Sequence, residues 1–259
     1  FNNHLFFFLI IIIILLKIDG IFCESYITLK INRVGYRNIL GPTNHFDNNY
    51  YPNYIYINGK KEEIIKSSYY FNQTDNYVEL IWNDSITNCK YMFMQCSDIT
   101  EIDLSNFDSS QILNTRYMFT SCISLTSINF ENFDTSKVTE MYDMFRNCSS
   151  LTSLNLSGFD TSNVVTMASM FKDCISLSSL NLSNFVTSKL SHLACAFQNC
   201  INLEYINLKN FDESQLTSYT DMFYNVPDNI VICINKDKTN NKIFPQIKSK
   251  TCYNIDCSN

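Results

Sequence analysis

Cysteine is the residue type best suited to chemistry in this chain, which has 259 residues, 11 cysteines and 3 histidines. Five cysteines recur at intervals of 26 residues: Cys96, Cys122, Cys148, Cys174 and Cys200. A column of thiolates could bind a soft metal or take part in redox exchange. The alternative is a small buried hydrophobic residue at a tight turn, which free cysteine also provides. Val226 occupies the next position of the series, so we favour packing.

Other candidates for catalysis are sparse. His192 and Cys195 could form a base and a nucleophile, but no third residue completes the arrangement. Asp134 and Asp160 recur at one repeat position, where capping of a helix explains them. The sequence contains no Gly-rich phosphate loop and no HExxH, GxSxG or CxxC motif. We therefore expect no enzyme, no cofactor and no metal site.

The cysteines belong to a repeated frame that is clearest at residues 144–169, MFRNCSSLTSLNLSGFDTSNVVTMAS. The same frame starts, with varying regularity, at Met92, Met118, Met170, Ala196 and Met222. Leu154 and Leu156 have a spacing of two, which predicts a short strand with both side chains on one face.

The second half of the frame changes its period. Val164, Met167, Phe171 and Cys174 are separated by three or four residues, which predicts a helix or a helical turn. The segment Asp160-Thr161-Ser162 would cap its first turn. A single unit has no partner for its apolar face, so several units must stack.

These patterns predict an α/β solenoid over residues 78–234, with five full units from Met92 to Asp221 and a half unit on each side. Residues 24–77 are expected to form a small β-rich N-terminal cap, with a separate binding module as the alternative. Within it, Asn58-Gly59 follows the alternating run Tyr54–Ile57 and predicts a hairpin.

The frame resembles the BspA-like leucine-rich repeats of cell-surface proteins. The residues that carry the resemblance are Met144, Phe145, Cys148, Leu151, Leu154, Leu156, Phe159, Asp160, Thr161, Ser162, Val164 and Met167. The resemblance implies a curved, right-handed solenoid and a role in adhesion or protein–protein contact. Phe159 stands where many leucine-rich repeats have an asparagine. Asparagines one position earlier could replace that hydrogen-bonded ladder: Asn106, Asn132, Asn184 and Asn210.

The N-terminus predicts entry into the secretory pathway. Leu5–Leu16 is a run of 12 apolar residues, too short for a membrane span but suited to a signal peptide. We place the signal peptide at residues 1–23, with cleavage after Gly20 as a second option and an uncleaved anchor as the alternative. Secretion would expose the cysteines to an oxidising environment. Cys233 and Cys252 are our candidate disulfide, and residues 235–259 would form a C-terminal cap or a juxtamembrane segment.

Outward-facing strand positions form the candidate binding face. Its residues are Asp103, Asn129, Asn155, Asn181, Tyr205 and Asn207. The alternative is a solvated face, because only Tyr205 resembles a binding hot spot. Candidate glycosylation sites are Asn72, Asn83, Asn147, Asn155 and Asn181. Glycans on Asn155 and Asn181 would obstruct the middle of this face.

The net charge of −6 and the absence of a basic stripe argue against nucleic acid as a partner. We predict a secreted or cell-surface, non-catalytic leucine-rich repeat protein for adhesion or protein–protein recognition. Its partner would be a protein or glycan on another surface. The alternative is the ectodomain of a signalling receptor, and membrane association could arise from an uncleaved N-terminal segment or a C-terminal span.

Overall fold

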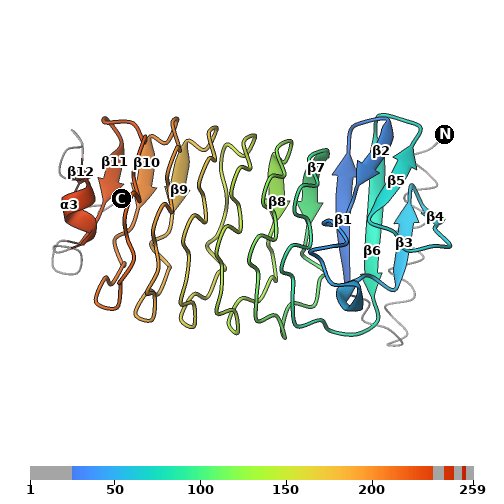
Figure 1. The fold of residues 1–259 in the computed structure, drawn as a ribbon, viewed down its shortest axis with the longest axis horizontal. Coiled ribbons are helices and arrows are strands. Elements are labelled where there is room, and N and C mark those ends of the chain that lie inside the picture. The colour runs from blue at the N-terminus through green and yellow to red at the C-terminus, as the bar shows by residue number, and fades with distance from the viewer. Residues whose placement is uncertain (1–24, 236–241, 248–252, 255–259) are drawn as a thin grey trace.

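The computed structural model describes residues 25–235, 242–247 and 253–254. The expected signal peptide, residues 1–23, and Cys252 lie outside the described residues. An N-terminal block of antiparallel strands is followed by repeat units that lie side by side along the long axis of the molecule (Figure 1). Among the described residues, no helix is both long and apolar enough to span a bilayer.

The N-terminal block is built from strands, as the alternating sequence predicts. Its elements are β1 (Ser25–Ile31), β2 (Gly35–Asn38), the 3-10 helix η1 (Asn48–Tyr50), β3 (Tyr54–Ile57), β4 (Lys60–Lys61), β5 (Ser68–Phe71) and β6 (Asn76–Trp82). Strand β6 lies between β3 and β1 and is antiparallel to both. The hairpin prediction is confirmed, since β3 and β4 pair across Asn58 and Gly59, whose φ angles of 52° and 79° suit a tight hairpin turn.

All but one of the repeat units contribute a short strand to one of two sheets. Their strands are β7 (Ile99–Asp103), β8 (Ser127–Asn129), β9 (Ser179–Asn181), β10 (Tyr205–Asn207) and β11 (Val231–Cys233), and α3 (Ile243–Ile247) and β12 (Tyr253–Asn254) follow them. Strand β7 pairs antiparallel with β1 and parallel with β8, so the first repeats extend the sheet of the N-terminal block. Strands β9 to β12 form a separate parallel sheet.

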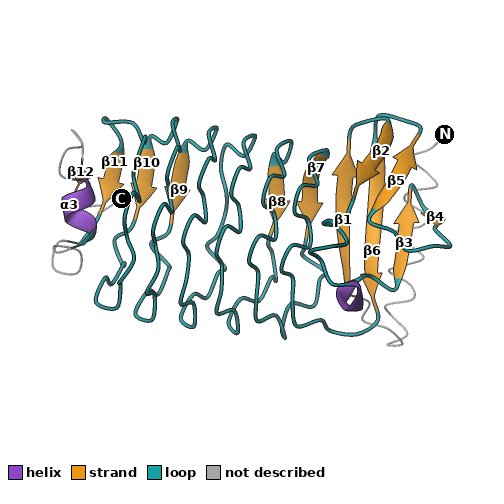
Figure 2. Ribbon diagram, viewed as in Figure 1, coloured by secondary structure: helices purple, strands orange, loops and turns teal. Residues whose placement is uncertain are grey.

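The expected strand at Leu154–Leu156 is not formed, and this unit lies between the two sheets (Figure 2). Leu154 is only partly buried, whereas the equivalent Ile102 and Leu180 are buried. The interruption adjoins Phe130, which stands where other units have leucine and whose ring lies 5.0 Å from that of Phe159.

The prediction of an α/β solenoid is wrong. Strands and turns dominate the described residues, and the helical segments there are η1 and α3, neither of which lies in a repeat unit. The expected helical halves are chains of turns. In each unit the residue equivalent to Tyr91 and the residue equivalent to Gln95 have φ between 54° and 66°. An α-helix of L-residues cannot contain such left-handed positions.

Hydrogen bonds between units explain why the turns replace a helix. Alternate N–H groups leave their own unit: the Tyr91 N–H donates to the Arg116 carbonyl at 3.0 Å, and the Phe93 N–H to the Met118 carbonyl at 2.8 Å. The N–H of Met92, between them, donates three residues back to Cys89. The apolar spacing of three and four residues still places its members in the core, because the turns bury the same positions that a helix would.

Two columns hold the units together. Phenylalanine rings from consecutive units stack with centroids 5.2–5.8 Å apart: Phe93, Phe119, Phe145, Phe171, Phe197 and Phe223. Each such buried ring contributes about 2 to 3 kcal/mol of apolar burial.

The second column is a threonine ladder. The Thr161 hydroxyl accepts from the Val186 N–H at 2.8 Å and donates to the Val186 carbonyl at 3.0 Å. Thr135 and Thr187 make the same pair of bonds to the residue 25 positions on.

At each end of the ladder a residue other than threonine accepts the equivalent hydrogen bonds. Ser25 of β1 accepts from the Asp108 N–H at 2.8 Å, in front of the first unit. Glu213 takes the threonine position after Thr187, and its carboxylate accepts from the N–H groups of Lys242 and Ile243 at the start of α3. The ladder thus joins the N-terminal block, the units and the last helix.

Candidate functional site

The candidate binding face proves to be a column of turn-forming side chains. The side-chain oxygen of one residue in each unit accepts the backbone N–H two residues further on, at 2.9–3.1 Å. These residues are Asp103, Asn129, Asn155, Asn181 and Asn207. Such Asx turns end the strand and explain why Asp and Asn recur there. Tyr205 is partly buried on β10. This column therefore has a structural role that accounts for it without a ligand.

The asparagine column one position before the usual site forms inter-unit bonds at three of its four expected residues. The fourth, Asn106, donates to the hydroxyl of its neighbour Ser105 at 3.1 Å. The side-chain amides of Asn132, Asn184 and Asn210 donate to backbone carbonyls of the preceding unit, at 3.2, 3.3 and 2.6 Å to the residue 27 positions earlier. Gly158 stands in this column between them, and nothing lies within 4 Å of where its Cβ would be. From Asn132 to Asn210, the unit with Gly158 is therefore the one that lacks this asparagine.

The five candidate glycosylation sites differ in accessibility. Asn72, Asn83, Asn155 and Asn181 are exposed. Asn147 is partly buried, and its side-chain nitrogen, the atom that would carry a glycan, donates to the Ser121 hydroxyl at 3.1 Å. Glycosylation remains a prediction, and we expect Asn147 to be the least occupied.

The cysteine column is buried, and its thiols hydrogen-bond between units. The Cys148 thiol donates to the Phe119 carbonyl at 3.1 Å, and the Cys174 thiol to the Phe145 carbonyl at 3.0 Å. Burial raises the pKa of these thiols above the ordinary range, and that of Cys200 to about 12. They are therefore protonated, weak nucleophiles, and the predicted packing role is confirmed.

The remaining cysteine and histidine candidates form no reactive cluster. His192 Nδ1 is hydrogen-bonded to the Ser191 hydroxyl at 2.7 Å, and Cys195 is a partly buried free thiol. In the described part of the chain, no three His, Cys, Asp or Glu side chains converge as metal ligands would. Cys233 is disulfide-bonded; because Cys252 is outside the described residues, that pairing stays a prediction.

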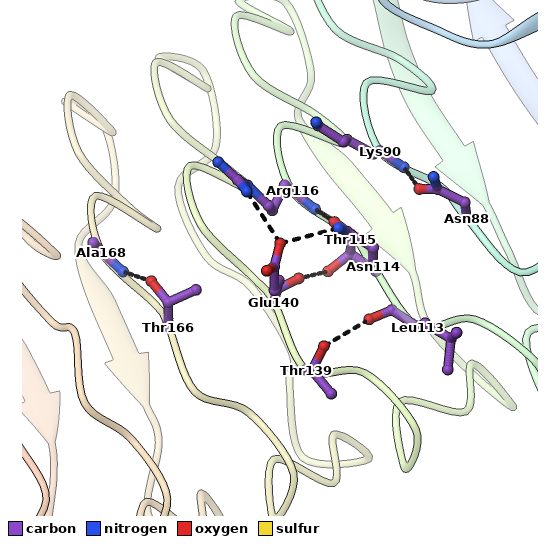
Figure 3. A network of polar contacts seen from close by, with 10 residues as sticks. All are labelled: Asn88, Lys90, Leu113, Asn114, Thr115, Arg116, Thr139, Glu140, Thr166 and Ala168. Atoms are coloured by element: carbon purple, nitrogen blue, oxygen red, sulfur yellow. Dashed lines mark hydrogen bonds and ion pairs between the residues drawn. The ribbon is translucent and has the colours of Figure 1, made fainter.

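A second ladder, on the turn-rich side of the units, presents a more varied surface. Isolated parallel bridges link one residue from each unit: Asn88, Asn114, Glu140, Thr166, His192 and Ser218. Around Glu140 the side chains form a polar network (Figure 3). Arg116 Nη1 and Asn114 Nδ2 both donate to Glu140 Oε2, at 3.2 and 3.0 Å. The carboxylate therefore neutralises Arg116 and fixes its direction.

Aromatic rings line the ladder beside this network. Tyr91 and Tyr117 stack with centroids 4.8 Å apart, and Tyr142 meets Tyr117 edge-on at 5.3 Å. The Arg116 guanidinium lies 5.3 Å from the Tyr142 centroid, and Lys90 Nζ lies 4.8 Å from that of Tyr91. We call these five residues, from three consecutive units, the tyrosine patch. All five are partly exposed, so part of each side chain is accessible to a ligand.

A shallow hollow of about 400 Å³ adjoins the tyrosine patch. It is lined by Arg116, Thr139, Glu140, Tyr142, Val165, Thr166 and His192. A second hollow, of about 700 Å³, lies in the N-terminal block next to Tyr51 and Lys66. The first is the better candidate, because aromatic surface, a paired charge and hydroxyl groups converge there, as in small-ligand sites.

A buried carboxylate, Asp143, directly follows Tyr142 of the patch in the chain. Asp143 is 1% exposed, and its Oδ2 lies 3.6 Å from Arg146 Nη1. Its Oδ1 is buried without a hydrogen-bond partner in the described structure. Burial raises the pKa of Asp143, which Arg146 only partly offsets. The sequence offered no sign of this burial, because Tyr91 and Tyr117 occupy the same frame position.

The tyrosine patch was missed from the sequence, although a signal was present. Lys90, Arg116 and Tyr142 share one frame position, and Tyr91 and Tyr117 share the next. These positions lie in the expected helical half of the unit and not on its strand, which is the predicted binding face.

The fold and the patch define a repeat protein with a polar, aromatic surface on its turn-rich ladder. Residues 46–129 and 122–231 each match the family described as Mycoplasma protein of unknown function, DUF285. Together the two segments span more than half of the chain, which therefore belongs to this family. The search of curated proteins found no match, and neither did the search of solved structures.

Proposed function

We propose that this protein is a non-catalytic recognition protein that enters the secretory pathway and binds a partner on another surface through the tyrosine patch. The observation that carries the proposal is the convergence of Tyr91, Tyr117, Tyr142 and Arg116 from consecutive units beside a hollow. Tyrosine and arginine are enriched at energetic hot spots, because they offer large contact areas together with polar ends.

The strand side is the weaker candidate for the same role. Its Asp and Asn side chains have their oxygens engaged in turns, and two of them, Asn155 and Asn181, lie in glycosylation sequons. None of the five sequons falls on a residue of the tyrosine patch. A glycosylated chain would therefore keep the patch free of its own glycans at those residues.

A secretory location is part of the proposal. It rests on the apolar run Leu5–Leu16, on the expected signal peptide, and on the disulfide at Cys233, which an oxidising compartment favours. The acidic net charge of −6 is compatible with a protein-rich or glycan-rich partner surface and unfavourable for nucleic acid.

Retention of the purified full chain on intact cells tests this function. We expect Tyr117→Ala and Arg116→Ala to reduce retention by about 10- to 30-fold, as truncation of a hot spot costs about 2 kcal/mol. Tyr224→Ala is the matched control, because Tyr224 is 62% exposed and lies outside the patch. Full retention by both patch variants, with unfolding midpoints like that of the wild type, would show that the patch is not the binding site.

A further inference from the structure

We propose that the ligand of the tyrosine patch is a neutral oligosaccharide, an inference that rests on the proposed function and specifies its partner. Five features of the hollow and its ladder favour this ligand class over an anionic molecule or an extended peptide. They concern charge, aromatic surface, hydroxyl chemistry, spacing and the state of the backbone.

The charges that line the hollow balance each other. Arg116 and Glu140 are the lining residues with a full charge at neutral pH, apart from the ionisable His192, and they form an ion pair at 3.2 Å. Glu140 also accepts from the Asn114 amide at 3.0 Å. An anionic ligand would have to displace Glu140 from Arg116, whereas an uncharged ligand leaves the pair intact.

Tyr142 presents to the hollow an aromatic ring that suits the C–H face of a sugar, and Tyr91 and Tyr117 continue the aromatic surface beside it. Tyr91 and Tyr117 are stacked on each other, and Tyr142 turns its ring by 72° relative to Tyr117. A pyranose has an apolar face of C–H groups and an equatorial rim of hydroxyls. It can pack on a ring while its rim bonds to polar neighbours, as amphipathic aromatic sites allow.

The polar lining matches hydroxyl groups, which both donate and accept. Thr139, Thr166 and Tyr142 carry hydroxyls of the same dual character. Burial raises the pKa of Tyr142, so its phenol keeps its proton and can donate. Carboxylate and phosphate ligands only accept, so a donor-rich cationic lining would be expected for them.

The geometry of the ladder favours an extended chain of sugars. Neighbouring units are bonded in parallel, so equivalent side chains repeat at about 4.8 Å along the ladder. This spacing is similar to the width of a pyranose ring, and the hollow takes residues from four successive units, at Arg116, Glu140, Thr166 and His192. Successive sugars could therefore meet successive units.

An extended peptide finds less support at this surface. Peptides that add a strand need unpaired backbone groups at a sheet edge. Here the backbone is already used between units: the Tyr117 N–H donates to the Tyr142 carbonyl, and the Met141 N–H to the Thr166 carbonyl, both at 3.0 Å.

Hydrolysis of a bound glycan is not expected. Glycosidases generally use two carboxylates, and Glu140 is the one carboxylate in the lining of the hollow.

The test is a glycan array probed with the full chain, followed by calorimetric titration of the best neutral oligosaccharide on it. The array carries neutral oligosaccharides together with sialylated and sulfated ones. We expect binding to neutral members, with an affinity that changes less than about twofold between about 50 and about 500 mM NaCl. Tyr117→Ala and Tyr142→Ala should each weaken binding at least tenfold. Tyr142→Phe should cause a smaller loss, because the ring is kept, and Tyr224→Ala should have no effect.

The outcomes separate this inference from the function on which it rests. Binding confined to acidic glycans, with a steep salt dependence, would overturn the neutral-ligand inference. Patch-dependent retention on cells that persists after enzymatic removal of surface glycans would also overturn it, while leaving the recognition function standing. If Tyr117→Ala and Tyr142→Ala both leave retention on cells and glycan binding unchanged, the neutral-ligand inference and the recognition function at the patch are both overturned.

Discussion

Replacement of Thr161 by valine tests whether the threonine ladder holds neighbouring units together. Thr161 is 1% exposed, and valine keeps its β-branched shape while replacing the hydroxyl with a methyl group, so the substitution opens no cavity. It removes one hydroxyl that bonds both the N–H and the carbonyl of Val186, at 2.8 and 3.0 Å. Any loss of stability then reports hydrogen bonding across one boundary between units.

The expected magnitude follows from these two bonds. Each ordinary hydrogen bond contributes about 1 kcal/mol net, and a buried N–H left without a partner costs about 1 to 3 kcal/mol. The contact is part-buried, so water can reach some of the exposed groups. We therefore expect the free energy of unfolding to fall by about 2 kcal/mol.

Urea unfolding followed by circular dichroism measures this loss. With a slope of about 2 to 3 kcal/mol per molar urea, the midpoint should fall by about 0.7 to 1 M. Thr126→Val is the matched control, because the Thr126 hydroxyl makes a single exposed bond to the Thr100 carbonyl at 3.0 Å. Its effect should stay below about 0.5 kcal/mol. Thr161→Ser should keep most of the stability, because the hydroxyl remains. Equal losses for Thr161→Val and Thr126→Val would refute the reasoning.

Three further predictions concern buried groups. Cys148 should resist alkylation by iodoacetamide in the folded protein at pH 8, because burial raises the pKa of its thiol, and should react in about 6 M guanidinium. Peptide mass spectrometry measures the labelling, and rapid labelling without denaturant would contradict this prediction. For Asp143, a folded-state pKa above the unfolded one gives stability that is complete below the unfolded pKa and is lost as pH rises through the folded pKa. Asp143→Asn should therefore gain stability relative to the wild type as pH rises from about 3 to about 7 in thermal unfolding, and a constant difference would exclude this linkage. Glu213→Gln should lower the unfolding free energy by about 1 to 2 kcal/mol, since it weakens charge-assisted bonds to Lys242 and Ile243, whereas the exposed Glu204→Gln should be neutral.

Much of the fold was predictable because the repeat encodes it in every unit. The period, the core positions, the cysteine column and the asparagine bonds of Asn132, Asn184 and Asn210 all follow from residues that recur at fixed offsets. The hairpin at Asn58-Gly59 was predictable from turn chemistry alone. In each case a local pattern and the packing of the units require the same structure.

The secondary structure of the second half of each unit was not predictable from its period. Apolar residues at spacings of three and four occur both in a helix and in this chain of turns, because both bury the same side chains. The difference lies in where the N–H groups go. That of Tyr91 donates to Arg116 in the next unit, and no single-unit pattern contains that partner.

The site was harder to predict for a related reason. The side chains of the tyrosine patch come from two frame positions, 142 and 143 in one unit, that carry different residue types from unit to unit. A column with constant residues signals packing, whereas these columns vary in residue type and give only a weak signal. Tyr91 and Tyr117 also have left-handed backbone, a conformation that is unusual for aromatic residues.

The contacts between units span between 25 and 29 residues: 25 for the threonine ladder, 26 for the bridges, 27 for the asparagines and 29 for the cysteines. Each contact therefore crosses one boundary, and none depends on the total number of units. An in-frame duplication of one unit would lengthen the molecule by about 4.8 Å while the closures at Ser25 and Glu213 stay as they are. The length of the repeat array can thus change by gene duplication, one unit at a time, without redesign of either end.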